Sequence, residues 1–177
     1  VVKLAIFGDY KMIDWNSVLE EIKDKPGQNA PFRLPLDEPA VKKMIDDLKD
    51  YPSESIEWFN YYPAVDFDVR IVKEFSDFVK MECVRAWISK INPGRTAPWH
   101  WDWDVNEEQH KRLGDLVRFH VSISPPASGH VFMVEEKCFY NERQGTIHEW
   151  DDYRSYHAGA NCGSEPKFLF NFLGYRK

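Results

Sequence analysis

The chain has 177 residues, of which 29% are charged and 43% are hydrophobic, a composition typical of an ordinary globular domain. Its 29 acidic residues outnumber its 23 basic residues, and the resulting net charge of −6 disfavours broad electrostatic binding to nucleic acid or to an anionic membrane. Three widely spaced cysteines suggest neither a disulfide framework nor a Cys-x-x-Cys pair, and no apolar run is long enough for a transmembrane helix, so the sequence predicts a cytoplasmic protein.

The first part of the chain has the periodicity of helices. Trp15, Val18 and Ile22 recur at helical spacing behind Asp14, which is a favourable N-cap residue. The same kind of spacing predicts helices over about residues 41–48 and 68–81. The aromatic segment at residues 53–63 predicts a short helix or an aromatic loop, with its rings either in the core or at a pocket mouth.

From residue 84 onward the hydrophobic period changes to that of a strand. The alternation is clearest over residues 116–124, where Val117 and Phe119 would face one way and Arg118 and His120 the other. Other strands are predicted at residues 84–91, 131–135, 146–150, 153–157 and 168–174, and residues 158–163 are predicted to be a turn. Many short strands with regular turns favour an all-β barrel or jelly roll.

These patterns predict a single domain over residues 1–177, mainly β with N-terminal helices. Residues 1–82 would form a helical support region that packs outside the barrel, and residues 83–177 would form the β core.

A His-x-Asp motif at His100 and Asp102 lies in a run of alternating tryptophans. On a strand, residues two apart share a face, so His100 and Asp102 would point together. A histidine and a carboxylate, joined by a second histidine, form the facial triad that binds non-haem Fe(II). The motif alone is weak, because a hydrogen-bonded surface pair has the same sequence, and Asp104 is an alternative carboxylate.

A second histidine and a lysine follow in a more specific order. His157 comes at least two predicted strands after Asp102, and Lys167 lies ten residues further on, at the start of the last strand. A lysine on the inward face of a small barrel is costly unless an anion meets it. His148 is an alternative second histidine, but no basic residue lies ten residues beyond it.

This ordered set resembles the Fe(II)- and 2-oxoglutarate-dependent dioxygenases, whose fold is the double-stranded β-helix, a jelly-roll or cupin-like barrel. Within that superfamily the sequence is most similar to the aspartyl/asparaginyl β-hydroxylases. The similarity covers about residues 84–175, and its matching stretches are the segment that ends at His100, the strand with Arg118 and His120, and the segment from His157 to Lys167.

The resemblance implies a metal site, a co-substrate site and a substrate site. His100, Asp102 and His157 would bind Fe(II), and Lys167 would grip the 5-carboxylate of 2-oxoglutarate. His120 would lie in the co-substrate pocket, and Arg118 would contact a carboxylate or amide of the substrate. The implied reaction consumes O2 and 2-oxoglutarate, releases succinate and CO2, and hydroxylates an amino acid, a peptide or a related acid or amide.

Two features depart from the aspartyl hydroxylase pattern. The animal enzyme lacks the carboxylate that Asp102 supplies here, and Leu116 stands where its first arginine would be. Arg118 is alternatively a member of a structural ion pair. The alternative function is a non-catalytic cupin-like barrel that binds a metal or a small acid, and a metal-dependent hydrolase or isomerase would not need Lys167 at its position.

Overall fold

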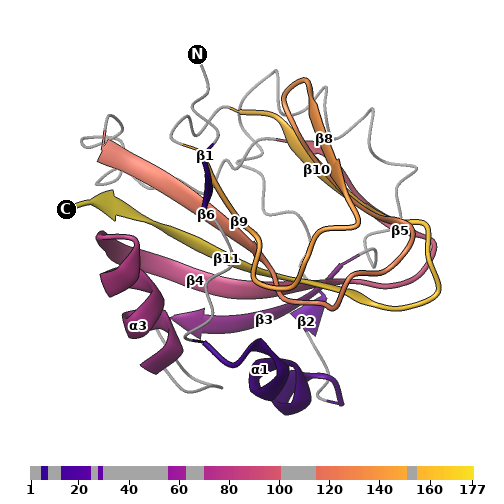
Figure 1. Ribbon diagram of the computed structural model, residues 1–177, viewed down its shortest axis with the longest axis horizontal. Coiled ribbons are helices and arrows are strands. Elements are labelled where there is room, and N and C mark those ends of the chain that lie inside the picture. The colour runs from indigo at the N-terminus through magenta and orange to yellow at the C-terminus, as the bar shows by residue number, and fades with distance from the viewer. Residues whose placement is uncertain are drawn as a thin grey trace.

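The computed structural model describes residues 5–7, 13–24, 28–29, 56–62, 70–100, 115–150 and 155–177 (Figure 1). Its elements in chain order are β1 (Ala5–Phe7), α1 (Trp15–Ile22), β2 (Gln28–Asn29), β3 (Ile56–Tyr62), α3 (Arg70–Phe78), β4 (Met81–Ile91), β5 (Arg95–His100), β6 (Leu116–Ser122), β7 (His130–Val134), β8 (Lys137–Tyr140), β9 (Ile147–Trp150), β10 (His157–Asn161) and β11 (Lys167–Arg176).

The strands form two antiparallel sheets. The large sheet has the order β1-β9-β6-β11-β4-β3-β2, and the small sheet has the order β5-β10-β7-β8. Both sheets combine strands that are distant in sequence, as in a jelly roll. The predicted fold is therefore confirmed: the protein is mainly β, with a double-stranded β-helix and helices packed outside it.

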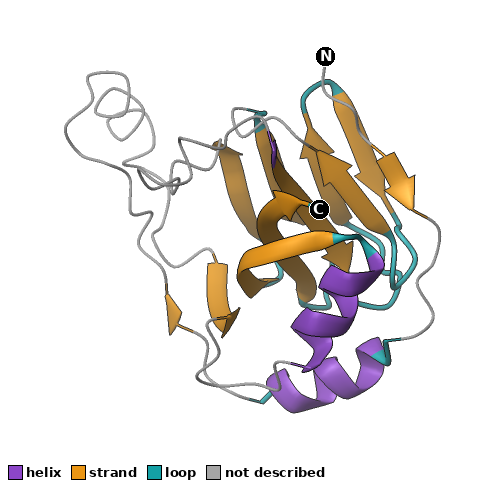
Figure 2. Ribbon diagram, turned by 90° about the vertical axis from the view of Figure 1, so that its left-hand side faces the viewer, coloured by secondary structure: helices purple, strands orange, loops and turns teal. Residues whose placement is uncertain are grey.

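Both helices of the described residues cover one face of the large sheet (Figure 2). Helix α1 begins where predicted, because the Asp14 carboxylate accepts hydrogen bonds from the backbone N–H groups of Asn16 and Ser17. Neither helix in this part of the chain has the length and apolar character needed to cross a membrane.

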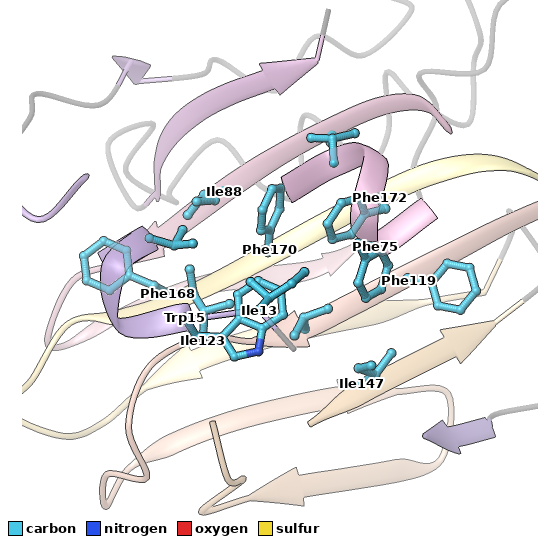
Figure 3. Packing of buried hydrophobic residues seen from close by; sticks show 14 of the residues in the cluster. Ile13, Trp15, Phe75, Ile88, Phe119, Ile123, Ile147, Phe168, Phe170 and Phe172 are labelled. Carbon is cyan, nitrogen blue, oxygen red and sulfur yellow. The ribbon is translucent and has the colours of Figure 1, made fainter. Parts of the chain in front are cut away.

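The main hydrophobic core lies between these helices and the large sheet (Figure 3). Trp15 of α1 meets Phe170 of β11 edge to face, with ring centroids 6.2 Å apart. Phe75 of α3 stacks on Phe172 of β11 at 4.0 Å and meets Phe119 of β6 edge to face at 5.7 Å. Aromatic packing of this kind stabilises a core beyond the burial of its area.

A β-bulge in β4 changes which of its side chains face this core. Gly174 of β11 pairs with Cys83, but Leu173 pairs with Arg85, so Val84 is an extra residue in β4. Before the bulge the core-facing residues are Met81 and Cys83, and after it they are Ala86 and Ile88. A Cβ atom at position 174 would lie 2.2 Å from the carbonyl oxygen of Glu82, so this close approach requires glycine.

Two segments differ from the predicted elements. Residues 56–62 form strand β3, not a helix or a loop, because they pair along the edge of β4. Strand β10 begins at His157, where the predicted strand ended, and residues 158–161 are strand and not turn because β5 and β7 pair with them on both sides. Helix α3 falls within the predicted span 68–81, and the helix predicted at 41–48 lies outside the described residues.

Helix α3 offers a matched test of this packing. Phe75 is fully buried and Phe78, on the same helix, is 42% exposed. We expect Phe75→Ala to lower the free energy of unfolding by about 3–5 kcal/mol, the usual cost of a large cavity. Phe78→Ala is expected to cost less than about 1 kcal/mol. Urea denaturation of both variants measures the difference, and equal losses would contradict the described packing of α3.

Candidate functional site

His100 and His157 lie directly opposite each other on neighbouring strands. They are register partners in the antiparallel pair β5–β10, and their ring centroids are 4.3 Å apart with the planes tilted by 52°. The Nδ1–H of His157 donates to the carbonyl oxygen of Ser155 at 3.1 Å. This bond selects the tautomer whose lone pair is on Nε2, the arrangement typical of metal-binding histidines.

The two histidines open into a pocket between the sheets. Its walls are mostly apolar and aromatic, with a few polar groups, which is typical of small-molecule sites. The lining residues are Trp87, Ser89, Ile91, Ala97, His100, Arg118, Phe119, His120, Phe132, Trp150, His157, Ala158, Gly159, Leu169, Asn171 and Phe172.

His120 is buried in this pocket, and its tautomer follows from its neighbour Asn171. The side-chain amide of Asn171 donates to Ser89 Oγ at 2.8 Å and to the Leu169 carbonyl at 3.2 Å, so its oxygen faces His120 Nδ1 at 3.0 Å. Nδ1 therefore carries the hydrogen and Nε2 the lone pair. Nε2 has no hydrogen-bond partner within the described part of the chain.

The environment of His120 keeps its ring neutral. Burial holds the pKa of His120 well below its ordinary value, and the positive charge of Lys167 lowers this pKa further. The ring also stacks on Phe132, with centroids 4.1 Å apart. His120 thus offers the pocket a hydrogen-bond acceptor, and it supplies no positive charge.

Lys167 is 1% exposed and is the first residue of β11, and its side chain crosses from the large sheet to β7 of the small sheet. Its ammonium group donates to the carbonyl oxygen of Val131 at 2.5 Å and lies 6.0 Å from the ring centroid of Phe132. Phe132 lines the pocket, and Lys167, which lies behind this ring, does not line it. Burial lowers the pKa of Lys167 to about 8, and the nearby Glu142 carboxylate opposes this shift.

The level of Lys167 relative to the two histidines follows from strand register. His157 pairs with Val134 of β7, and the Lys167 ammonium bonds to Val131 of the same strand. Three residues along a strand correspond to about 10 Å. The ammonium group therefore lies about 10 Å from the level of the histidine pair, measured along β7.

Arg118 lies far from Lys167 along the large sheet, because its register partner on β11 is Leu173, six residues from Lys167. It is 4% exposed, lines the pocket, and is the register partner of Trp150 on β9. The Trp150 ring lies 5.4 Å from the ring of His157, measured between centroids. The predicted alternation of β6 is confirmed, because Arg118 and His120 face the pocket and Val117 and Val121 belong to the helix-side core.

The remaining candidate residues lie elsewhere. His148 is fully buried and its Nε2 contacts the carboxylate of Glu142, so it is held away from the pair His100–His157. Asp102 and Asp104 lie outside the described residues. Within the described ranges, no cluster of three or more His, Cys, Asp and Glu side chains could hold a metal ion.

Sequence reasoning did not single out several residues of the pocket, notably Trp87, Phe132 and Trp150. Trp87 and Trp150 line it from β4 and β9, and Phe132 lines it from β7. The position of Trp87 could have been predicted from alternation along β4, because Trp87, Ser89 and Ile91 share one face of the strand. The aromatic content of the other two strands is equally compatible with a core position.

The protein has structural relatives but no sequence match. No protein-family model and no curated protein matches the sequence. The structure is similar to a viral collagen prolyl hydroxylase from Paramecium bursaria Chlorella virus-1, solved as a 2OG complex, with 16% identity over 88% of this chain and 98% of that one and a TM-score of 0.50. It is also similar to a prolyl hydroxylase from Trichoplax adhaerens, solved with a peptide fragment of the hypoxia inducible factor oxygen degradation domain. That alignment has 11% identity, covers 97% of this chain and 83% of the other, and has a TM-score of 0.60.

The burial of the Lys167 ammonium group allows a prediction about the free energy of unfolding and its dependence on pH. Lowering a lysine pKa from 10.5 to about 8 corresponds to about 3 kcal/mol of stability lost at neutral pH. The unfolded chain binds the proton more tightly, so the wild-type protein gains stability as the pH rises from about 8 to 10.5. We expect Lys167→Met to raise the free energy of unfolding at pH 7 by about 1–3 kcal/mol and to remove that gain.

Urea denaturation between pH 7 and pH 10 measures both effects. The matched control is Lys73→Met, which removes an exposed lysine from α3 and should change the pH profile little. A Lys167→Met protein that is less stable than wild type at pH 7 would contradict the assigned cost of burying this charge.

Proposed function

We propose that this protein is an Fe(II)- and 2-oxoglutarate-dependent dioxygenase that hydroxylates an amino acid, a peptide or a related acid or amide. The observation that carries the proposal is the cross-strand pair His100–His157 at a pocket of a double-stranded β-helix. The fold is shared with two prolyl hydroxylases, one of them solved as a 2OG complex and the other with a peptide.

The donor set fits a divalent metal. Two imidazoles on adjacent strands converge, and the hydrogen bond to Ser155 turns the lone pair of His157 to Nε2. Asp102, two residues beyond His100, is the proposed third ligand, and two histidines with one carboxylate suit non-haem Fe(II). Iron bound there supplies O2 chemistry, with 2-oxoglutarate as the co-substrate that is converted to succinate and CO2.

Lys167 is the proposed anchor of the co-substrate. The distance of about 10 Å along β7 between its ammonium group and the level of His157 suits an extended five-carbon diacid, with a metal contact at one end and a salt bridge at the other. The carboxylate would give the buried ammonium group an opposite charge. His120 is neutral and lies between these two ends, where it would line the co-substrate pocket. The ionised diacid has no hydrogen to donate, so the Nε2 lone pair would accept from a water or from an N–H or O–H group of the substrate.

The substrate would occupy the other side of the histidine pair. Trp150 lies against His157 and pairs with Arg118, and Arg118 and His157 line the same pocket. The Arg118 guanidinium group would therefore meet a substrate that lies beside the proposed metal. An arginine in that position suits a carboxylate, which it can bind through two parallel hydrogen bonds. The aromatic walls would exclude water from the reacting carbon.

The metal site is tested by anaerobic titration with Fe(II), with the binding affinity measured by calorimetry. We expect His100→Ala, His157→Ala and Asp102→Ala each to weaken binding more than about a hundredfold, since even the outer partners of metal ligands are worth ten- to hundredfold. Asp104→Ala is the matched control for the carboxylate, and it should bind as wild type does. Wild-type affinity in either histidine variant would refute the proposed site.

The activity itself is tested by succinate formation from 2-oxoglutarate with Fe(II) and O2, against a panel of amino acids and peptides. Succinate formation that requires His100, Asp102 and His157 supports a dioxygenase. Tight metal binding without any conversion of 2-oxoglutarate would instead favour a non-catalytic cupin-like barrel.

The role of Lys167 predicts a pH dependence of co-substrate binding. The carboxylate binds the protonated lysine, whose pKa is about 8 in the absence of ligand. The 2-oxoglutarate affinity should therefore be constant below pH 8 and fall by up to about tenfold per pH unit above it. Lys167→Ala should weaken 2-oxoglutarate binding at least about thirtyfold while metal binding survives. Lys90→Ala, which removes a lysine from the helix-facing side of β4, is the control.

A further inference from the structure

The pocket face of the large sheet carries a second arginine in line with Arg118. Leu173 of β11 pairs with Arg85 of β4 on one side and with Arg118 of β6 on the other, so the three residues form one row across the sheet. Neighbouring strands lie about 4.8 Å apart, which puts the Cα atoms of the two arginines about 10 Å apart. Two arginine side chains can converge on one ligand across that distance.

The bulge in β4 turns Arg85 toward the pocket. Without the extra residue Val84, strict alternation from Met81 and Cys83 would put Arg85 on the helix-facing side. The guanidinium carbon of Arg85 lies 5.0 Å from the ring centroid of Trp87, and Trp87 lines the pocket. Stacking on an aromatic face orients a guanidinium group.

Arg118 is more buried than Arg85, as expected if Arg85 lies nearer to the entrance of the pocket. Arg118 is 4% exposed and lies inside the pocket, whereas Arg85 is half-buried and can be reached from solvent. Leu173, between them, is 2% exposed, and it forms an apolar floor with Trp87 in one small cluster. The row thus combines an inner cation, an outer cation and an apolar surface.

This row is too far from Lys167 to hold the same anion. Leu173 and Lys167 lie six residues apart on β11, which corresponds to about 20 Å along the strand. The proposed co-substrate spans only about half of that length, from Lys167 to the level of His157. An anion held by Lys167 and the histidine pair therefore does not reach the two arginines.

We infer that Arg85 and Arg118 together bind a substrate that carries two anionic groups, and that Arg85 determines the specificity for the outer one. The inference rests on the proposed function and names its substrate class: a dicarboxylic amino-acid derivative or an acidic segment of a peptide. Each guanidinium group can bind one carboxylate bidentately, and Trp87 and Leu173 contact the carbon chain between them.

The test uses three probes of nearly equal size: N-acetylaspartate with two carboxylates, N-acetylasparagine with one, and N-acetylasparagine amide with none. Binding is measured by calorimetry on anaerobic protein loaded with Fe(II) and 2-oxoglutarate, so the co-substrate site is filled and no turnover occurs. The wild-type protein should bind the dianion most tightly and the neutral probe most weakly.

The decisive variant is Arg85→Gln, with Lys90→Gln as its control on the helix-facing side of the same strand. Arg85→Gln should weaken binding of the dianion about ten- to a hundredfold, the value of a hydrogen bond to a charged group, and should bind the monoanion nearly as wild type does. Lys90→Gln should keep the full preference. Arg85→Lys keeps the positive charge but loses the planar guanidinium group, so its affinity for the dianion should lie between those of the wild-type protein and Arg85→Gln.

Two results would overturn the inference. One is equal affinity of the wild-type protein for the three probes, including no detectable binding of any of them at millimolar concentration. The other is an unchanged dianion preference in an Arg85→Gln protein with a wild-type unfolding temperature. If the wild-type protein does not bind Fe(II) or 2-oxoglutarate, that result refutes the proposed function instead. The same three probes can then still be titrated into the metal-free protein.

Discussion

The packing of three phenylalanines on the helices fixes the phase of β11, and the pocket depends on that phase. Phe168, Phe170 and Phe172 belong to the core under α1 and α3, so the intervening Leu169 and Asn171 must face the pocket. A slip of one residue would bury lysine and asparagine under the helices and turn the phenylalanines into the pocket. Because β11 pairs with both β4 and β6, its phase also sets which of their residues line the site.

The space between the two sheets holds polar groups that reduce the stability of the barrel. The Lys167 ammonium group is almost fully buried, and its lowered pKa reflects the cost of keeping it charged there. Neutral His120 keeps a buried lone pair, and Asn171 and Ser89 form the hydrogen-bond chain that fixes its orientation. Groups of this kind are retained where a ligand uses them, and they are the usual places at which a fold departs from the most stable core.

The arrangement along the pocket has a direction. The Lys167 ammonium group lies about 10 Å along β7 from the level of His157, and the arginine row lies about 20 Å along β11 from Lys167. Under the proposed function, two acidic ligands would bind without competing, the co-substrate near Lys167 and the substrate near the arginine row. They would then approach the metal from opposite sides.

Local patterns in the sequence determined much of this fold. The alternation of residues 116–124 correctly separated the core-facing side of β6 from the side with Arg118 and His120. The helical spacing behind Asp14 located α1, and the order of His100, His157 and Lys167 was evident from the chain alone. Alternation and capping are properties of a few consecutive residues, so a single sequence is enough to reveal them.

Tertiary structure decided how these segments meet. That His100 faces His157, that Asn171 orients His120 and that β3 is a strand all depend on register between segments distant in the chain. The position of Arg85 depends on a bulge that only the pairing of β4 with β11 defines. Asp102, outside the described residues, stays a prediction from the spacing of its motif. Strand phase is local, but register is fixed by contacts across the sheet, and the sequence pattern of one strand does not specify its neighbour.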